Sequence, residues 1–117
     1  MRGAKVRYIA VAGCEGREDE ALAEVERNLN WLLGALGEHE VRLGFTRLGD
    51  LCVARVEMRH GRLLDAVIFS ISLSRVGGTY LRPIRSSGTM RGLLERLKAM
   101  GCPARLGDEG KPSQSDE

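Results

Sequence analysis

The hydrophobic period of this chain switches repeatedly between that of a strand and that of a helix, and the order of the switches restricts the possible folds. Residues 5–12 (KVRYIAVA) have the β-branched and aromatic composition of a strand. Apolar side chains then recur along residues 17–36 at the spacing of one helical face, and Gly37 ends that stripe. Residues 41–59 alternate apolar and polar side chains around a turn at 48–50, which predicts a hairpin with one apolar and one basic face.

Residues 62–76 (RLLDAVIFSISLSRV) fit both periods, and the choice between them decides the fold. Their serines alternate with apolar residues as in a strand, but the length of the segment and the Gly77-Gly78 pair that closes it favour a helix. Such a helix is apolar nearly all round, so more than one of its sides must be buried. Phe69 and Leu73 lie outside its main apolar stripe, and we expect a further element or a partner protein to cover them.

Residues 79–85 (TYLRPIR) predict the last strand, and the final helix follows from Met90. Pro83 cannot donate a hydrogen bond to a neighbouring strand, so this strand is expected at an edge of the sheet. Residues 1–100 are thus predicted to form a single α+β domain. Its order β-α-β-β-α-β is that of a ferredoxin-like sandwich, with an additional C-terminal helix. Residues 101–117 are acidic, rich in glycine, proline and serine, and without period, which predicts a disordered tail.

The cysteines and the apolar runs exclude several classes of protein. Cys14, Cys52 and Cys102 are far apart and form no C-x-x-C pair, which excludes a cysteine-only zinc site and leaves one disulfide open. No apolar run approaches the ~18 residues that a membrane span needs, and the first residues alternate with charge, unlike a secretion signal. We therefore expect a cytoplasmic protein with no membrane partner.

Charge is distributed unevenly along the sequence, although the formal net charge is only +2. Residues 15–40 hold eight acids and two arginines, whereas residues 41–100 hold eleven bases, all but one of them arginine, and four acids. Because the planar guanidinium group matches pairs of phosphate oxygens, a nucleic-acid partner is the functional interpretation. The alternative is that the arginine content reflects genome composition or thermal adaptation, with the charges simply solvated.

The sequence contains no recognisable catalytic set. No phosphate-binding loop, dinucleotide motif or metal-ligand spacing occurs, and neither His39 nor His60 has a carboxylate or serine pattern around it. We expect no catalytic residue, no metal ligand and no cofactor bound by the protein. Residues 51–59 (LCVARVEMR) also lack the aromatic side chains that stack RNA bases, so we expect contact with the phosphate backbone of a folded RNA.

Residues 82–97 (RPIRSSGTMRGLLERL) combine fixed positive charge with a turn before the final helix. Ser87 and Thr89 can cap this helix, and their hydroxyls with the free amides of its first turn can form a seat for an anion. A plain helix cap is the simpler alternative. The predicted RNA-contacting residues are Arg82, Arg85, Ser87, Thr89, Arg91 and Arg96.

A second surface is predicted from large side chains that the apolar stripes do not use. Trp31 points about 140° away from the centre of the stripe of the first helix, at about 100° per residue. It either lies along its own helix or docks on another molecule. Together with Phe69 and Leu73, it forms the predicted protein-partner surface.

Several of these segments resemble protein component 2 of ribonuclease P, a family of archaea and eukaryotes. They are RYIA in the first strand, a helix ending in Gly77-Gly78, a strand running to Arg85, and SGTMRGLLERL. The similarity covers residues 5–100 and is most specific over residues 76–97. The resemblance implies a ferredoxin-like fold and a role as a subunit of the endoribonuclease that removes the 5′ leader from precursor tRNA.

In this family the RNA component, with its Mg²⁺ ions, performs the hydrolysis, so the resemblance implies no catalytic residue in this chain. It implies three partners: the ribonuclease P RNA, protein component 3 and a second copy of the chain, with precursor tRNA contacted indirectly. The final helix departs from the family pattern, because its Lys/Arg run is sparser than usual and Glu95 interrupts it.

Two other classes of function fit the same predicted topology. One is a small regulatory domain that binds a metabolite. The other is an acylphosphatase-like enzyme, which needs a phosphate-cradling loop with an arginine and an asparagine after the first strand. The segment CEGRED supplies Arg17 but surrounds it with acids that repel phosphate, so this class is the least favoured.

Overall fold

The structure is a computed structural model that describes residues 3–34 and 40–101. Its elements in chain order are β1 (Lys5–Ala12), α1 (Glu18–Leu33), β2 (Val41–Leu48), β3 (Leu51–Met58), η2 (Gly61–Leu63), α3 (Leu64–Leu73), β4 (Arg75–Val76), β5 (Thr79–Tyr80), β6 (Arg82–Ser87) and α4 (Met90–Ala99). The chain is therefore α+β, as predicted. The predicted end of the first helix at Gly37, the position of His39 and the tail beyond Gly101 lie outside the described residues.

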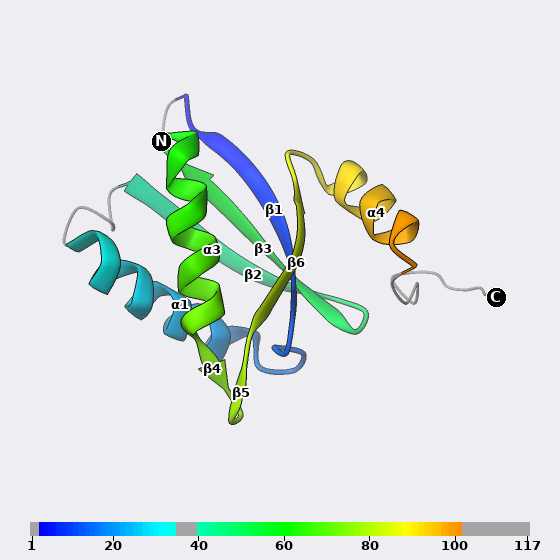
Figure 1. Cartoon of the computed structure of the whole chain (residues 1–117), viewed down its shortest axis with the longest axis horizontal. Helices are drawn as coiled ribbons and strands as arrows, with labels where there is room; N and C mark the ends of the chain where they lie inside the picture. Colours follow the sequence, from blue (N-terminus) through cyan, green and yellow to red (C-terminus); the bar gives the residue numbers. More distant parts are fainter. Residues whose placement is uncertain (1–2, 35–39, 102–117) are drawn as a thin grey trace.

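Four strands form one antiparallel sheet in the order β2-β3-β1-β6 (Figure 1). β6 lies at an edge of this sheet, which confirms the position predicted from Pro83. The pairing shifts register between Ala10 and Val11, where Ile84 is the extra residue on β6. Because directly paired residues point to the same face of a sheet, the register assigns every strand side chain to one face or the other.

α1 and α3 cover one face of the sheet and enclose the larger core with it (Figure 1). Val25 of α1 and Val67 of α3 are completely buried there, together with Ile9 and Val56 of the two central strands. Three acids fill the first turn of α1, where the helix dipole favours negative charge.

α4 packs on the opposite face of the sheet, apart from the other two helices (Figure 1). Leu93 and Leu97 are its fully buried residues, and they contact a second apolar cluster that contains Ala10, Leu51 and Val53. Burial of each leucine stabilises the packed helix by about 2 kcal/mol. The predicted amphipathic helix from Met90 is confirmed, with its start at that residue.

The segment around residues 62–81 differs from the prediction in two ways. The helix ends at Leu73, and Gly77-Gly78 form the turn of a short β4–β5 hairpin, with φ angles of 62° and 84°, instead of a helix cap. The predicted strand 79–85 is divided into β5 and β6 at Leu81, whose amide donates to the Ser74 carbonyl at 2.9 Å. The physical reason is burial: the hairpin lets Val76 and Leu81 both enter the core.

A disulfide joins Cys14, in the loop after β1, to Cys52 of β3. The two Cα atoms are 6.2 Å apart, the residues are 38 positions apart in sequence, and both side chains are completely buried. The bond closes the loop that contains α1 and β2. None of the helices within the described ranges combines the length and apolar character that a membrane crossing requires.

Candidate nucleic-acid interface

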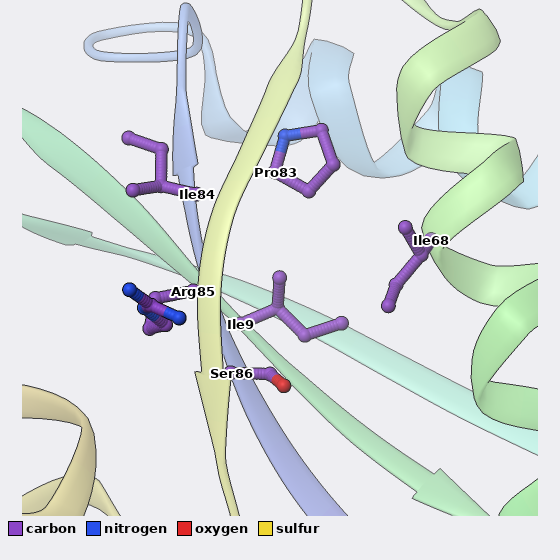
Figure 2. A pocket seen from close by; sticks show the side chains of 6 residues that line it. All are labelled: Ile9, Ile68, Pro83, Ile84, Arg85 and Ser86. Atoms are coloured by element: carbon purple, nitrogen blue, oxygen red, sulfur yellow. The ribbon is translucent and has the colours of Figure 1, made fainter. Parts of the chain in front are cut away.

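Edge strand β6 carries three of the six predicted RNA-contacting residues, Arg82, Arg85 and Ser87, and sends its side chains to both faces of the sheet. Figure 2 shows Ile84 and Arg85 on one side of β6, and Pro83 and Ser86 on the side of α3, where Ile9 and Ile68 also point. These six residues line a hollow of about 260 Å³ beside the strand. The register places Arg82 opposite Ala12 and Arg85 opposite Ala10, so both arginines belong to the face that carries α4.

Arg85 connects the edge strand to the end of α4. Its Nε donates to the Sδ of Met100 at 3.1 Å. Arg96 lies one helical turn before Met100, so its Cα stands on the same side of the helix. Arg82, Arg85 and Arg96 are exposed, and none of them forms an ion pair with a carboxylate in the described ranges. The fold thus brings Arg85 and Arg96 to one end of α4, with charges that are not neutralised within the described chain.

The turn between β6 and α4 is a compact helix cap. Thr89 is the N-cap residue, and its Oγ1 accepts from the Gly92 amide at 3.0 Å. Ser87 is only 6% exposed, and its Oγ accepts from the Thr89 amide at 3.4 Å. Both hydroxyls are therefore engaged with the backbone of the turn. Ser87 shapes the turn from inside, while Thr89 and the first turn of α4 lie at the surface.

Arg91 extends from the first turn of α4 and is 90% exposed. Its Nε lies 3.7 Å from the Glu95 carboxylate, one turn further along the helix. An exposed i, i+4 pair of this kind contributes only about 0.3–0.5 kcal/mol, so a phosphate can compete for the guanidinium group. Glu95 nevertheless lowers the positive potential of this part of the helix.

The face of the sheet that carries α4 is rich in bases, and the acids of α1 lie on the other side. The strand residues that point to the α4 face and the exposed side of α4 include two acids, Glu57 and Glu95. The same surface carries seven exposed bases, which are Arg42, Arg55, Arg82, Arg85, Arg91, Arg96 and Lys98. On the opposite side of the sheet, α1 carries the acids Glu18, Asp19, Glu20, Glu24 and Glu26 with Arg27 alone as a base. We call the surface with the seven exposed bases the basic face.

Arg7 is an arginine of this region that the sequence reasoning missed. It lies in phase with Ile9 on β1, and one of its terminal nitrogens donates to the Ser86 Oγ at 3.3 Å. Its Nε is buried and has no hydrogen-bond partner within the described chain. The alternation in KVRYIAVA could have identified Arg7, because it places this charged residue among the core-facing positions of the strand. Arg7 fixes the Ser86 end of β6 from the side opposite to α4.

Arg42 and Arg55 were recognised as part of a basic hairpin face but were not assigned to the site. Arg55 donates to the Glu57 carboxylate at 2.7 Å, and Arg42 lies 4.0 Å from the other oxygen of the same group. The hydrogen bond from Arg55, followed by the charges of Arg55 and Arg42, holds the pKa of Glu57 below its ordinary value. Glu57 and then the Tyr8 hydroxyl raise the pKa of Arg55.

The three residues of the predicted protein-partner surface are all exposed. Trp31 is 80% exposed, Phe69 52% and Leu73 40%. Phe69 and Leu73 lie one turn apart on α3. Trp31 is on α1, three residues after Asn28, whose amide donates to the Ser74 hydroxyl at 2.9 Å where α3 ends. These residues stay a predicted surface, on the side of the sheet opposite to α4.

The loop between β1 and α1 binds its own carboxylates. The Gly13 amide donates to Glu15 at 3.1 Å, and the Gly16 amide donates to Glu18 at 2.9 Å. The amide of Glu18 itself and that of Gly16 lower the pKa of Glu18, and the charge of Arg47 adds to this effect. Both glycine amides are thus already used by acids of the chain, which disfavours an acylphosphatase-like role.

No protein-family model matches this chain, and no curated protein matches it. In the ranges 3–34 and 40–101, no three His, Cys, Asp or Glu side chains group as metal ligands would. The functional assignment therefore rests on the positions and charges of the residues described above.

Proposed function

We propose that this chain is an RNA-binding accessory subunit of ribonuclease P, the ribonucleoprotein that removes the 5′ leader from precursor tRNA. The single observation that supports this most is the basic face, where seven exposed bases stand against the two acids Glu57 and Glu95. The acids of α1 lie on the other side of the sheet. A protein with one basic face can bind the phosphates of a folded RNA there and keep the acids of α1 away from the RNA.

The proposed contacts are made with the phosphate backbone. Arg82, Arg85 and Arg96 supply guanidinium groups without carboxylate partners in the described ranges, and each can bind two phosphate oxygens. Arg91 and the cap at Thr89 extend this surface over the first turn of α4. The chain is proposed to position the RNA, while the RNA with its own Mg²⁺ ions performs the hydrolysis.

The strand order supports a ferredoxin-like arrangement within this proposal. β1 and β3 occupy the centre, β2 and β6 the edges, and all three pairings are antiparallel. The positions of α1, between β1 and β2 in the chain, and of α3, between β3 and β6, support the proposed split βαβ sandwich. α4 is the additional C-terminal helix.

The α3 side of the molecule is proposed to meet a protein. Phe69 and Leu73 expose apolar area that the domain itself does not cover. Protein component 3 and a second copy of the chain are the proposed partners for this area and for Trp31. An RNA on the basic face and a protein on the α3 side can then bind at the same time.

The experiment that tests the proposal is purification of the tagged chain from native extract under mild conditions. We expect a discrete large RNA to copurify and the particle to cleave the 5′ leader from precursor tRNA in the presence of Mg²⁺. A matched preparation with Arg82, Arg85 and Arg96 changed to glutamine is expected to retain less of that RNA. Recovery of the chain with no discrete RNA would contradict the proposal.

A further inference from the structure

α4 covers only part of its face of the sheet. It buries Leu51 and Val53, whereas Arg42 and Arg55, further along β2 and β3 on the same face, are exposed. The register aligns Arg55 with Gly44 on one side and Tyr8 on the other, and Glu57 with Arg42. We call this surface, made of Tyr8, Arg42, Gly44, Arg55 and Glu57, the open sheet surface.

The open sheet surface is concave and has a fixed cationic floor. A hollow of about 180 Å³ is lined by Arg42, Gly44, Arg55 and Glu57, with Leu43. A side chain on Gly44 would meet no atom within 4 Å, so the space above this strand is open. The Arg55 guanidinium is held in place by its 2.7 Å hydrogen bond to Glu57, and Tyr8 is its cross-strand neighbour.

We propose that the open sheet surface binds an unpaired nucleotide of a single-stranded RNA segment. The base lies above Gly44 and stacks on the Arg55 guanidinium, next to the Tyr8 side chain, because planar cations attract the faces of bases. Arg42 is the phosphate contact. Its side chain is more exposed than that of Arg55 and lies further from the Glu57 carboxylate, at 4.0 Å. Glu57 keeps Arg55 in position and can accept from an amino group of the base.

The charges and the surroundings of this surface favour RNA over a protein segment. Two arginines share one carboxylate, so the surface keeps a positive charge. Tyr8 packs in the same apolar cluster as Met90, so the surface continues into the first turn of α4 and the proposed phosphate contacts there. Platforms of this kind bind bases with little sequence preference. This inference rests on the proposed function and adds a single-stranded contact to its backbone contacts.

Fluorescence anisotropy tests whether the open sheet surface binds an unpaired nucleotide. The three probes are a short oligouridine, an abasic strand of equal length, and a short RNA duplex. The variant is Arg42→Gln/Arg55→Gln. Its matched control is Arg17→Gln/Arg27→Gln, which also removes two arginines that form exposed ion pairs, but with acids of α1. We expect the variant to bind oligouridine about tenfold more weakly and the control to stay within about twofold of the natural protein. Thermal unfolding checks that both variants are folded.

The remaining outcomes separate this inference from the function on which it rests. We expect the natural protein to prefer oligouridine to the abasic strand and the variant to lose that preference, with duplex binding changed less in both. If the variant binds oligouridine as the natural protein does, or if the natural protein binds the abasic strand equally well, the base platform is wrong. In either case, duplex binding that depends on Arg82, Arg85 and Arg96 leaves the proposed function standing. If the natural protein binds none of the probes, both fail.

Discussion

A Cβ atom added to Gly92 in α4 would stand 2.5 Å from the Ser87 Oγ at the end of β6. The same atom would stand 3.0 Å from the Thr89 Oγ1 that caps the helix. The first turn of α4 therefore packs directly against the turn that precedes it, with no room for a methyl group. This contact sets the position of α4 relative to β6, and so the relative position of the arginines on the basic face.

Replacement of Gly92 by alanine is expected to destabilise the protein, although alanine is the better helix former. The helix-propensity gain of about 1 kcal/mol is opposed by an overpacking cost of about 1–3 kcal/mol, because the Ser87 hydroxyl must move and release the Thr89 amide. We expect a net loss of about 1 kcal/mol in the free energy of unfolding, measured by urea titration.

Gly61→Ala is the control for this prediction. A Cβ at Gly61 would meet no atom within 4 Å, and its backbone does not have a positive φ angle. The control is expected to leave stability unchanged or slightly raised. A Gly92→Ala protein more stable than the natural one would show that the turn and the helix are not in close contact.

Most of the fold follows from periodicity, because the apolar spacing along the chain distinguishes helices from strands. The edge position of β6 follows from the missing donor of Pro83, and the start of α4 from its apolar stripe. The β4–β5 hairpin was missed for a physical reason. Gly77-Gly78 suit a helix end and a tight hairpin turn equally well, and only the burial of Val76 and Leu81 decides between them.

The candidate site was predicted less completely than the fold. The arginines of β6 and α4 could be listed from the sequence, but their common face depends on the bulge at Ile84, which shifts the alternation along β6. The burial of Ser87 and the role of Arg7 depend on contacts across strands that one sequence does not show. The open sheet surface required the register of β1, β2 and β3, and the limited extent of α4.

The pairing of Cys14 with Cys52 predicts that one thiol per chain is titratable after unfolding without reductant. Cys102 is the third cysteine of the sequence. Since the bond closes a loop over a separation of 38 residues, the chain-entropy relation assigns it about 4 kcal/mol of stabilisation. Urea unfolding with and without reductant measures this difference. Three free thiols, or equal stability in both conditions, would contradict the disulfide.

Glu18 and Glu57 are expected to make stability depend on acid pH. The pKa values of both carboxyls in the folded protein lie below the ordinary value of 4.5. Their contribution to the free energy of unfolding is therefore complete above that pH. It is lost as the pH falls through the lowered folded values. Melting temperatures between neutral and acid pH should fall less steeply in Glu18→Gln and Glu57→Gln than in the natural protein. Glu26→Gln controls for the loss of one carboxylate, and an acid slope unchanged in both test variants would count against the two contacts.

The exposed face of α3 is expected to determine self-association and binding of protein component 3. Phe69→Ser/Leu73→Ser removes two exposed apolar side chains, so we expect stability to change little and partner binding to weaken by about 2 kcal/mol or more. Sedimentation with and without the partner measures both. Tyr80→Ser, which removes another exposed ring, is the control. Partner binding that is unaffected by the α3 double variant would exclude this face.

The salt dependence of RNA binding tests the central claim most directly. The variant Arg82→Gln/Arg85→Gln/Arg96→Gln is compared with Arg17→Gln/Arg27→Gln/Arg59→Gln, in which three ion-paired arginines are removed instead. Each phosphate contact contributes about 0.7–0.9 to the slope of log K against log salt concentration, so the account predicts a slope reduced by about 2–3 for the first variant. The second should keep the natural slope. Equal slopes for both variants would contradict the claim that the basic face binds RNA phosphates.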